Sequence, residues 1–133
     1  MNERQRVIPV RSDLDIIAAR QAGREMSRAL GFGIVDQTRI VTTISELARN
    51  VFNYAGGGTL TLNVVEASHR QGIEIICEDS GPGIPDVERA LKGGYSTSNG
   101  LGRGIAGSKA LMDEFELKSE VGKGTRVVAR KWK

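Results

Sequence analysis

Glycine constrains the fold of this 133-residue chain more than any other residue type, because most of its seventeen glycines occur in clusters. Four clusters stand out along the chain: Gly56-Gly57-Gly58, Gly81 with Gly83, Gly93 through Gly107, and Gly122 with Gly124. Glycine allows backbone conformations and close approaches that a Cβ atom forbids. Each cluster therefore predicts a tight turn, or a place where a ligand or another backbone lies against the chain.

The rest of the composition is that of an ordinary soluble globular protein, with 39% hydrophobic and 26% charged residues. The length fits one domain, so we expect a single domain over residues 1–133. One cysteine, Cys77, and one histidine, His69, exclude a disulfide framework and a Cys- or His-rich metal site. We expect Cys77 to be a small core residue and His69 to lie in a solvated turn. The single cysteine predicts a reducing compartment and therefore a cytoplasmic protein. The polar N-terminus predicts no signal peptide, and the composition predicts no membrane span.

Charge gives a weaker signal, since the formal net charge is +3 and aromatic residues make up only 5%. A nucleic-acid-binding domain normally shows a basic stripe with interleaved aromatic residues, so we do not expect nucleic acid as a partner. The cations near the C-terminus are expected on a solvated strand face. They are Lys118, Lys123, Arg126, Arg130, Lys131 and Lys133.

Hydrophobic spacing predicts a short strand and two helices in the first part of the chain. The strand at 7–10 is expected at a sheet edge because it contains a proline, which cannot donate to a ladder. Ser12 is expected to cap a helix that ends at Gly31. Asp36 is expected to cap a second helix that ends at Gly56.

The period then changes to two, with apolar residues at alternate positions from Leu60 to Cys77 around a polar turn at 68–72. This pattern predicts an antiparallel hairpin. The elements expected after it are a weak helix at 86–91, a loop at 92–103, a short helix at 105–112, a strand from Phe115 and a last strand at 127–129. The expected fold class is α+β, a two-layer sandwich whose mixed, mostly antiparallel sheet is covered by helices on one face.

Polar and glycine-rich motifs fall at the ends of these elements. Glu46 and Asn50 are four residues apart on the second helix, which places them on one face, one turn apart. A carboxylate and an amide oxygen in this arrangement can hold Mg²⁺ and a water or hydroxyl group. Taken alone, such a pair is more often an ordinary feature of a helix surface.

A second motif consists of Asp79, at the end of a hairpin strand, with Gly81 and Gly83 after it. The carboxylate can accept a hydrogen bond there, and the glycines allow a flat ring to approach the backbone. The same residues also suit an Asx turn that ends the strand.

A third motif leads into the predicted helix at 105–112 and contains Gly100, Gly102, Arg103 and Gly104. Successive backbone N–H groups at a helix N-terminus can bind an anion. No buried strand is expected before these glycines, which excludes a dinucleotide-binding fold, and the lysine and serine that follow stand in the wrong order for a P-loop.

The fourth motif, Gly122-Lys123-Gly124-Thr125, predicts a tight turn before the last strand, where Thr125 could hydrogen-bond a ligand. In this order the four motifs resemble the nucleotide-binding boxes of the GHKL ATPase superfamily, which has the Bergerat fold and includes gyrase, Hsp90, histidine kinases and MutL. The resemblance covers nearly the whole chain. Within the superfamily, the size of the chain and its runs at 93–102 and 111–115 resemble the small bacterial anti-sigma-factor serine kinases. The resemblance is strongest to the switch kinase of the stressosome.

The resemblance implies ATP and Mg²⁺ as cofactors. Asp79, helped by Thr125, would accept a hydrogen bond from the adenine amine, next to Gly81 and Gly83. Asn50 would hold Mg²⁺ on the phosphates. Glu46 would then be the general base that takes the proton from an incoming serine hydroxyl.

The resemblance also assigns the glycines of the third motif to the phosphates. Gly102 and Gly104 would offer backbone N–H groups to the phosphates, and Gly100 would also belong to the nucleotide site. Residues 92–103 would form a lid that closes over ATP. Histidine-kinase lids often carry a lysine shortly before these glycines. This chain has Ser98-Asn99 there, and Arg103 could replace that cation.

For activity, the resemblance implies a protein serine/threonine kinase that phosphorylates STAS-domain antagonist proteins and is held by STAS-domain scaffolds. Once released, it would activate a PP2C-type phosphatase and thereby a sigma factor. Two alternatives stay open: a nucleotide-dependent binding module with little turnover, and a detached histidine-kinase catalytic domain. Glu46 favours the kinase over the binding module. The length, together with the strand at 7–10 directly before a helix, favours the kinase over the detached domain.

Overall fold

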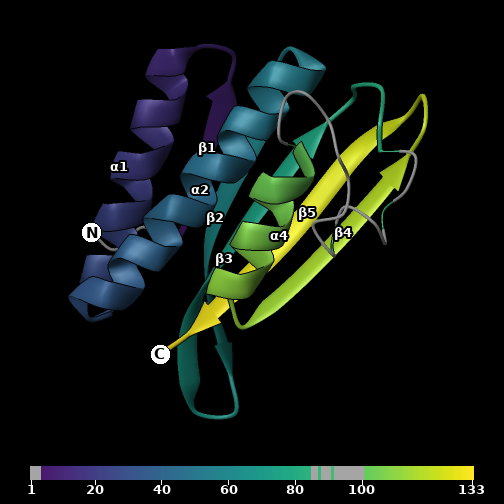
Figure 1. Ribbon diagram of the computed structural model, residues 1–133. Coiled ribbons are helices and arrows are strands. Elements are labelled where there is room, and N and C mark those ends of the chain that lie inside the picture. Colours follow the sequence, from purple (N-terminus) through teal and green to yellow (C-terminus); the bar gives the residue numbers. More distant parts are fainter. Residues whose placement is uncertain (1–3, 85–86, 88–90, 92–100) are drawn as a thin grey trace.

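The computed structural model describes residues 4–84, 87, 91 and 101–133, apart from the side chains of residue 54 and residues 101–104. Figure 1 shows the helices and strands of this part of the chain. Their bounds are β1 Gln5–Val10, α1 Asp13–Ala29, α2 Ile34–Ala55, β2 Gly58–Ala67, β3 Arg70–Asp79, α4 Leu101–Leu111, β4 Glu114–Glu120 and β5 Gly124–Trp132. The helix predicted at 86–91 and the loop predicted at 92–103 fall largely outside the described residues.

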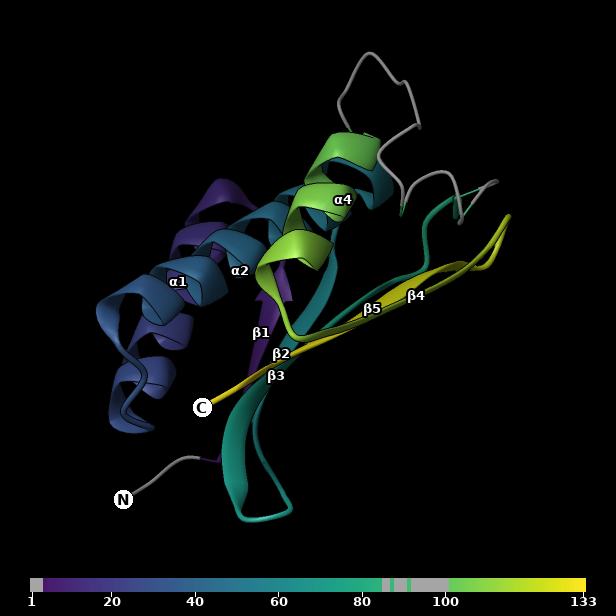
Figure 2. The same ribbon diagram turned by 60° about the horizontal axis from the view of Figure 1, so that its bottom comes forward.

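The strands form one sheet in the order β1-β2-β3-β5-β4, and α1, α2 and α4 all lie on one face of it (Figure 2). The predicted α+β two-layer fold is therefore confirmed. The sheet was expected to be mixed, but every pairing between the described strands is antiparallel. The reason is that β3 and β4 run in the same direction while β5 lies between them, so they never pair.

The first helix begins as predicted, because the Ser12 hydroxyl accepts a hydrogen bond from the backbone N–H of Asp15. The predicted cap of the second helix was wrong. Gly33 is the N-cap of α2, and Asp36 lies in the first turn of the helix, where its negative charge interacts favourably with the helix dipole. The end of α2 at Gly56 is confirmed, with φ of 74° in the left-handed region that favours glycine.

The β2–β3 hairpin has a tighter turn than expected. Only Ser68 and His69 stand between the strands, with φ of 48° and 68°, and β3 begins at Arg70 because the polar residues after the turn continue the ladder. His69 is exposed in this turn, as predicted. Cys77 lies on the inner face of β3 at 2% exposure, so its prediction as a small core residue is confirmed as well.

The last strand corrects the prediction that the C-terminal cations are all solvated. Arg130 faces away from the helices and pairs with Glu74 at 2.8 Å. Its neighbour Lys131 faces the helices and is only 9% exposed. The ammonium group of Lys131 donates to the carbonyl of Leu111, at the C-terminus of α4, at 3.0 Å, and lies 3.5 Å from Asp113. A buried ammonium group is tolerated because these oxygens replace water.

Gly107 offers a test of the α4 assignment, since it is exposed and an added Cβ atom would meet no other atom within 4 Å. We expect Gly107→Ala to stabilise the protein by about 0.5–1 kcal/mol, because alanine loses less backbone entropy in a helix. Urea denaturation measures this change. The matched control is Gly23→Ala in α1, where the new Cβ atom would overlap Ile44, so that variant should be less stable than the parent. Destabilisation by Gly107→Ala would contradict the helix.

Candidate functional site

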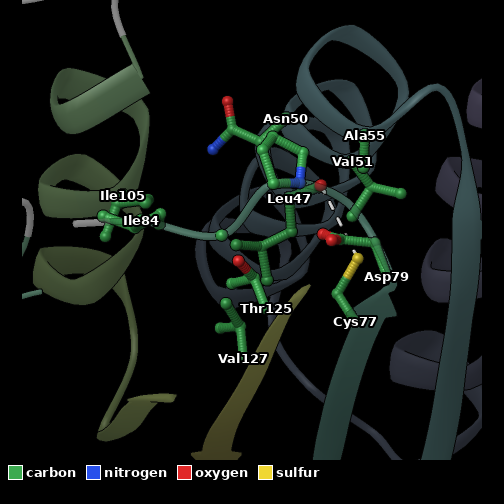
Figure 3. A pocket seen from close by; sticks show the side chains of 12 residues that line it. Leu47, Asn50, Val51, Ala55, Cys77, Asp79, Ile84, Ile105, Thr125 and Val127 are labelled. Carbon is green, nitrogen blue, oxygen red and sulfur yellow. Dashed lines mark hydrogen bonds between the residues drawn. The ribbon is translucent and has the colours of Figure 1, made fainter. Parts of the chain in front are cut away.

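A pocket lies between the C-terminal half of α2, the adjoining ends of β3 and β5, and α4 (Figure 3). Its empty volume is about 470 Å³, including space that is open to solvent. Most of its lining is apolar, and the polar side chains in it are those of Asn50, Asp79 and Thr125. The remaining lining residues are Leu47, Val51, Ala55, Cys77, Pro82, Gly83, Ile84, Ile105 and Val127. A concave apolar slot with a few convergent polar groups is typical of a site for a small organic ligand.

The β3–β5 ladder brings two of the predicted site residues together. Asp79 is the last residue of β3 and pairs directly with Thr125 near the start of β5. Both side chains point into the pocket (Figure 3). The Oδ1 atom of Asp79 accepts a hydrogen bond from the backbone N–H of Gly81 at 2.9 Å, which is the Asx turn that the sequence allowed. Among the described residues no donor reaches Oδ2 of Asp79, so this oxygen can accept from a ligand.

The glycines after Asp79 have packing roles of their own. A Cβ atom on Gly81 would lie 2.5 Å from the Cβ atom of Ala55, at the end of α2. Gly83 has φ of 79°, and a Cβ atom there would lie 2.4 Å from the carbonyl oxygen of Glu120. Gly83 lines the pocket and Gly81 does not. Contact with a flat ring remains a prediction for both residues.

Asn50 lies at the rim of the pocket, one helical turn after Glu46 on α2. Its Nδ2 atom is buried and finds no hydrogen-bond partner in the part of the chain that the structure describes. An unsatisfied buried polar group costs about 1–3 kcal/mol, which a polar ligand in the pocket would offset. Because amide oxygen and nitrogen can exchange places by a flip, this side chain could offer either atom to a ligand.

Glu46 lies outside the lining of the pocket. Its Oε1 atom accepts a hydrogen bond from Arg49 at 3.0 Å, and Arg49 also donates to the hydroxyl of Ser45 at 3.4 Å. The Glu46 side chain is 36% exposed. Its carboxylate is therefore held by an ion pair and still open to a second molecule.

The oxygen atoms of Asn50 and Glu46 could bind Mg²⁺ only when the ion is also coordinated by a polyphosphate. Within the described ranges, no three His, Cys, Asp or Glu side chains are grouped so that they could hold a metal ion. Mg²⁺ in phosphoryl-transfer sites commonly takes one or two protein oxygens and completes its shell with phosphate and water. An amide oxygen from Asn50 suits that limited role.

The third motif lies at the start of α4. Gly102, Arg103 and Gly104 belong to the first turn of this helix, which begins at Leu101, four residues earlier than predicted. Gly100 lies outside the described residues, as does most of the predicted lid. The first N–H groups of a helix have no partner within it and are suited to an anion.

Residues 35–133 match the model of the histidine kinase-, DNA gyrase B- and HSP90-like ATPases. The chain belongs to this ATPase family. The predicted membership of the GHKL superfamily is thereby confirmed. The serine/threonine-protein kinase RsbT of Bacillus subtilis (strain 168) is 51% identical over 132 residues, which cover 99% of this chain and 98% of the relative.

More distant relatives in the family include two anti-sigma F factors. That of Caldanaerobacter subterraneus subsp. tengcongensis is 33% identical over 99 residues, which cover 70% of this chain and 68% of the relative. That of Geobacillus stearothermophilus is 32% identical over 101 residues, which cover 71% and 68%. RsbT and these anti-sigma F factors together confirm the predicted similarity to the anti-sigma-factor serine kinases. As for the membrane, none of the helices in the described part of this ATPase-family chain has the length and apolar character to span one.

The apolar residues of the ATPase-family pocket had no role as site residues in the sequence predictions. Ile84 and Ile105 form part of its apolar wall, one just after the second motif and one in α4. A third residue, Ser119, holds the wall in place: its hydroxyl accepts from the backbone N–H of Ile84 at 2.7 Å and lies 2.8 Å from the Thr125 hydroxyl. A lone serine in a strand carries no signal of such a role.

Cys77 also lines the pocket, but it is not poised to react. Burial, and then the charge of Asp79, raise the pKa of the Cys77 thiol, so that the thiol stays protonated. Its Sγ atom donates to the carbonyl of Leu47 at 3.6 Å, drawn as a dashed line in Figure 3.

Proposed function

We propose that this chain is an ATP-dependent serine/threonine protein kinase that uses Mg²⁺, with residues 1–133 forming one kinase domain of the GHKL type. The observation that carries the proposal is the meeting of three sequence motifs in one pocket. Asn50, Asp79 and Thr125 line it together, and Glu46 stands one helical turn from Asn50. The similarity to RsbT, which is named a serine/threonine-protein kinase, supports the same reaction class.

The purine ring of ATP would lie in the apolar part of the pocket, with its amino group toward Asp79. The Oδ2 atom of this carboxylate has no donor in the described part of the chain and is an acceptor whenever it is ionised. Thr125 stands beside it and adds a second polar contact. Gly81 and Gly83 keep the turn after Asp79 close to the pocket.

The phosphates would lie toward α4 and the C-terminal half of α2. Asn50 would hold Mg²⁺, which when bound neutralises phosphate charge and so makes the terminal phosphoryl group easier to transfer. Gly102 and Gly104 would contribute N–H groups from the first turn of α4, with Gly100 next to them. Arg103 would supply a positive charge near the same phosphates.

Glu46 would act as the general base. A serine or threonine hydroxyl of the substrate protein would approach its exposed carboxylate, which would take the proton as the oxygen attacks the terminal phosphorus. The ion pair with Arg49 restrains the carboxylate on the α2 face that it shares with Asn50. This ion pair orients the carboxylate before substrate arrives.

The proposed substrates are STAS-domain antagonist and scaffold proteins of a stressosome-type switch in the cytoplasm. The chain would be held by unphosphorylated STAS-domain proteins, and phosphorylation would release it to activate a PP2C-type phosphatase. This partner set is what the resemblance to anti-sigma-factor kinases implies. The anti-sigma F factors among the relatives support a role in sigma-factor control.

The proposal is tested by incubating the purified chain with Mg-ATP and a candidate STAS-domain protein, and measuring phosphate on that protein by intact mass. A partner in which the modified serine or threonine is replaced by alanine is the control. Transfer to the first partner and not to the second is the expected result. A stable complex and ATP binding without any transfer would instead favour the nucleotide-dependent binding module.

The adenine contact gives a separate prediction. Asp79→Asn should weaken ATP binding by about tenfold or more, because an amide can turn its N–H₂ group toward the donor of the base. Isothermal titration calorimetry with Mg-ATP measures the change. The matched control is Glu78→Gln, since Glu78 faces the other side of the sheet and pairs with Arg126 at 3.7 Å. Equal affinities for both variants would exclude Asp79 as the adenine acceptor.

A further inference from the structure

Ser119 has an unusually complete set of hydrogen bonds for a single hydroxyl group. It lies on the inner face of β4, where it pairs with Thr125 of β5. Its Oγ atom is 2.7 Å from the backbone nitrogen of Ile84, 2.8 Å from Oγ1 of Thr125 and 3.1 Å from the carbonyl oxygen of Gly124. Two of these three contacts belong to residues that line the pocket.

The chemistry of the three partners decides where each proton lies. The backbone N–H of Ile84 can only donate, and the carbonyl of Gly124 can only accept. A serine hydroxyl has one proton and two acceptor positions. The Ser119 proton therefore goes to Gly124, because two oxygens 3.1 Å apart without a proton between them would repel each other. The Thr125 hydroxyl must then donate its own proton to Ser119.

Thr125 is thereby left with only acceptor positions for the pocket. Its strand partner Asp79 is also an acceptor, since its carboxylate carries no proton when ionised. Two adjacent acceptors match an amino group, which has two hydrogens to donate. A carbonyl oxygen on the ligand in the same place would face oxygen lone pairs from both residues.

We propose that Ser119 is a positioning residue that sets nucleotide specificity: it fixes Thr125 as an acceptor, so that the pocket prefers a 6-aminopurine over a 6-oxopurine. The proposal rests on the proposed function, because it takes the pocket to bind the base of a nucleoside triphosphate. It adds a residue that never touches the ligand. Removing the Ser119 hydroxyl would free the Thr125 proton, and Thr125 could then donate to a 6-oxo group.

The test compares the affinities for ATP and ITP, which carry an amino and an oxo group at the same ring position. Titration calorimetry is done with the parent chain, Ser119→Ala, Ser119→Thr and Thr125→Val, and each fold is checked by thermal melting. We expect the parent to prefer ATP. Ser119→Ala should reduce the ATP-to-ITP affinity ratio by about tenfold, because the Thr125 hydroxyl would no longer be restricted to accepting a hydrogen bond. Ser119→Thr keeps a hydroxyl group and should therefore keep the ATP-to-ITP affinity ratio of the parent.

A double-mutant cycle shows whether Ser119 acts through Thr125. In the Thr125→Val background, Ser119→Ala should leave the ratio unchanged, because no hydroxyl remains for Ser119 to orient. A purely structural role would instead lower both affinities together and keep the ratio constant in every variant, which would overturn the proposal.

Two further outcomes keep the proposal separable from the proposed function. If Ser119→Ala does not fold, Thr125→Val alone decides: it should weaken ATP binding and should not weaken ITP binding, because the repulsion between the Thr125 oxygen and the 6-oxo group is removed. An equal loss for both nucleotides would overturn the acceptor role. If the parent binds ATP but shows no preference over ITP, only this inference fails. If the parent binds neither nucleotide, the proposed function fails with it.

Discussion

Replacing Glu46 by glutamine should slow phosphoryl transfer to the partner protein by about 10²–10⁴-fold, the usual contribution of a general base. The carboxylate is 36% exposed and lies outside the pocket lining, so a second protein can reach it. Glutamine keeps its shape but cannot accept the proton. ATP affinity should stay nearly constant, because Glu46 does not line the pocket. The substitution also breaks the exposed ion pair with Arg49, which contributes only about 0–1 kcal/mol to stability.

The rate is measured as partner phosphorylation at saturating Mg-ATP, and the affinity is measured by calorimetry on the same preparations. Glu116→Gln is the matched control, since Glu116 is exposed on the opposite face of the sheet in β4. A Glu46→Gln variant that keeps the parental rate would exclude Glu46 as the base. A parallel loss of ATP affinity would show that Glu46 holds nucleotide.

The second large effect is expected at Gly124, which packs directly on the backbone that carries Asp79. A Cβ atom there would lie 2.1 Å from the carbonyl oxygen of Asp79, and φ is 123°, which other residues rarely adopt. We expect Gly124→Ala to lower the free energy of unfolding by about 2–5 kcal/mol, from overpacking and backbone strain together. ATP affinity should fall as well, because the clash displaces the carboxylate.

Gly122 supplies the control for this substitution. It also has a positive φ, 82°, but an added Cβ atom would meet nothing within 4 Å. Gly122→Ala should therefore cost only the strain, about 1–2 kcal/mol. Urea denaturation of both variants measures the difference. Equal destabilisation by Gly124→Ala and Gly122→Ala would mean that the contact with the Asp79 carbonyl adds nothing to the cost of the backbone strain.

Much of this architecture could be predicted from local patterns. The alternation from Leu60 to Cys77 identifies the central hairpin, because a strand has a strict period of two. The cap at Ser12 and the stop at Gly56 rest on local backbone chemistry and were predicted correctly. The four motifs pointed to the ATPase family because their order along the chain is specific even where each one alone is weak.

Other features could not be predicted, because they depend on which strand becomes the neighbour of which. The insertion of β5 between β3 and β4 makes the sheet fully antiparallel among the described strands. That same insertion places Thr125 beside Asp79 and Ser119 beside Thr125. No local signal identifies Ser119, since its three hydrogen-bond partners come from a loop and the next strand.

Periodicity, capping and motif order were enough to predict α1, α2, the hairpin and the family, and to propose the polar residues that could bind a nucleotide. The three-dimensional arrangement was needed to show which of those residues share a pocket, which glycines are needed for packing and which cations are buried. Arg130 and Lys131 show the reason: they are adjacent and equally charged, yet one pairs on the open face and the other lies under α4. Burial is set by the layer that covers each face of the sheet, and that layer comes from distant parts of the chain.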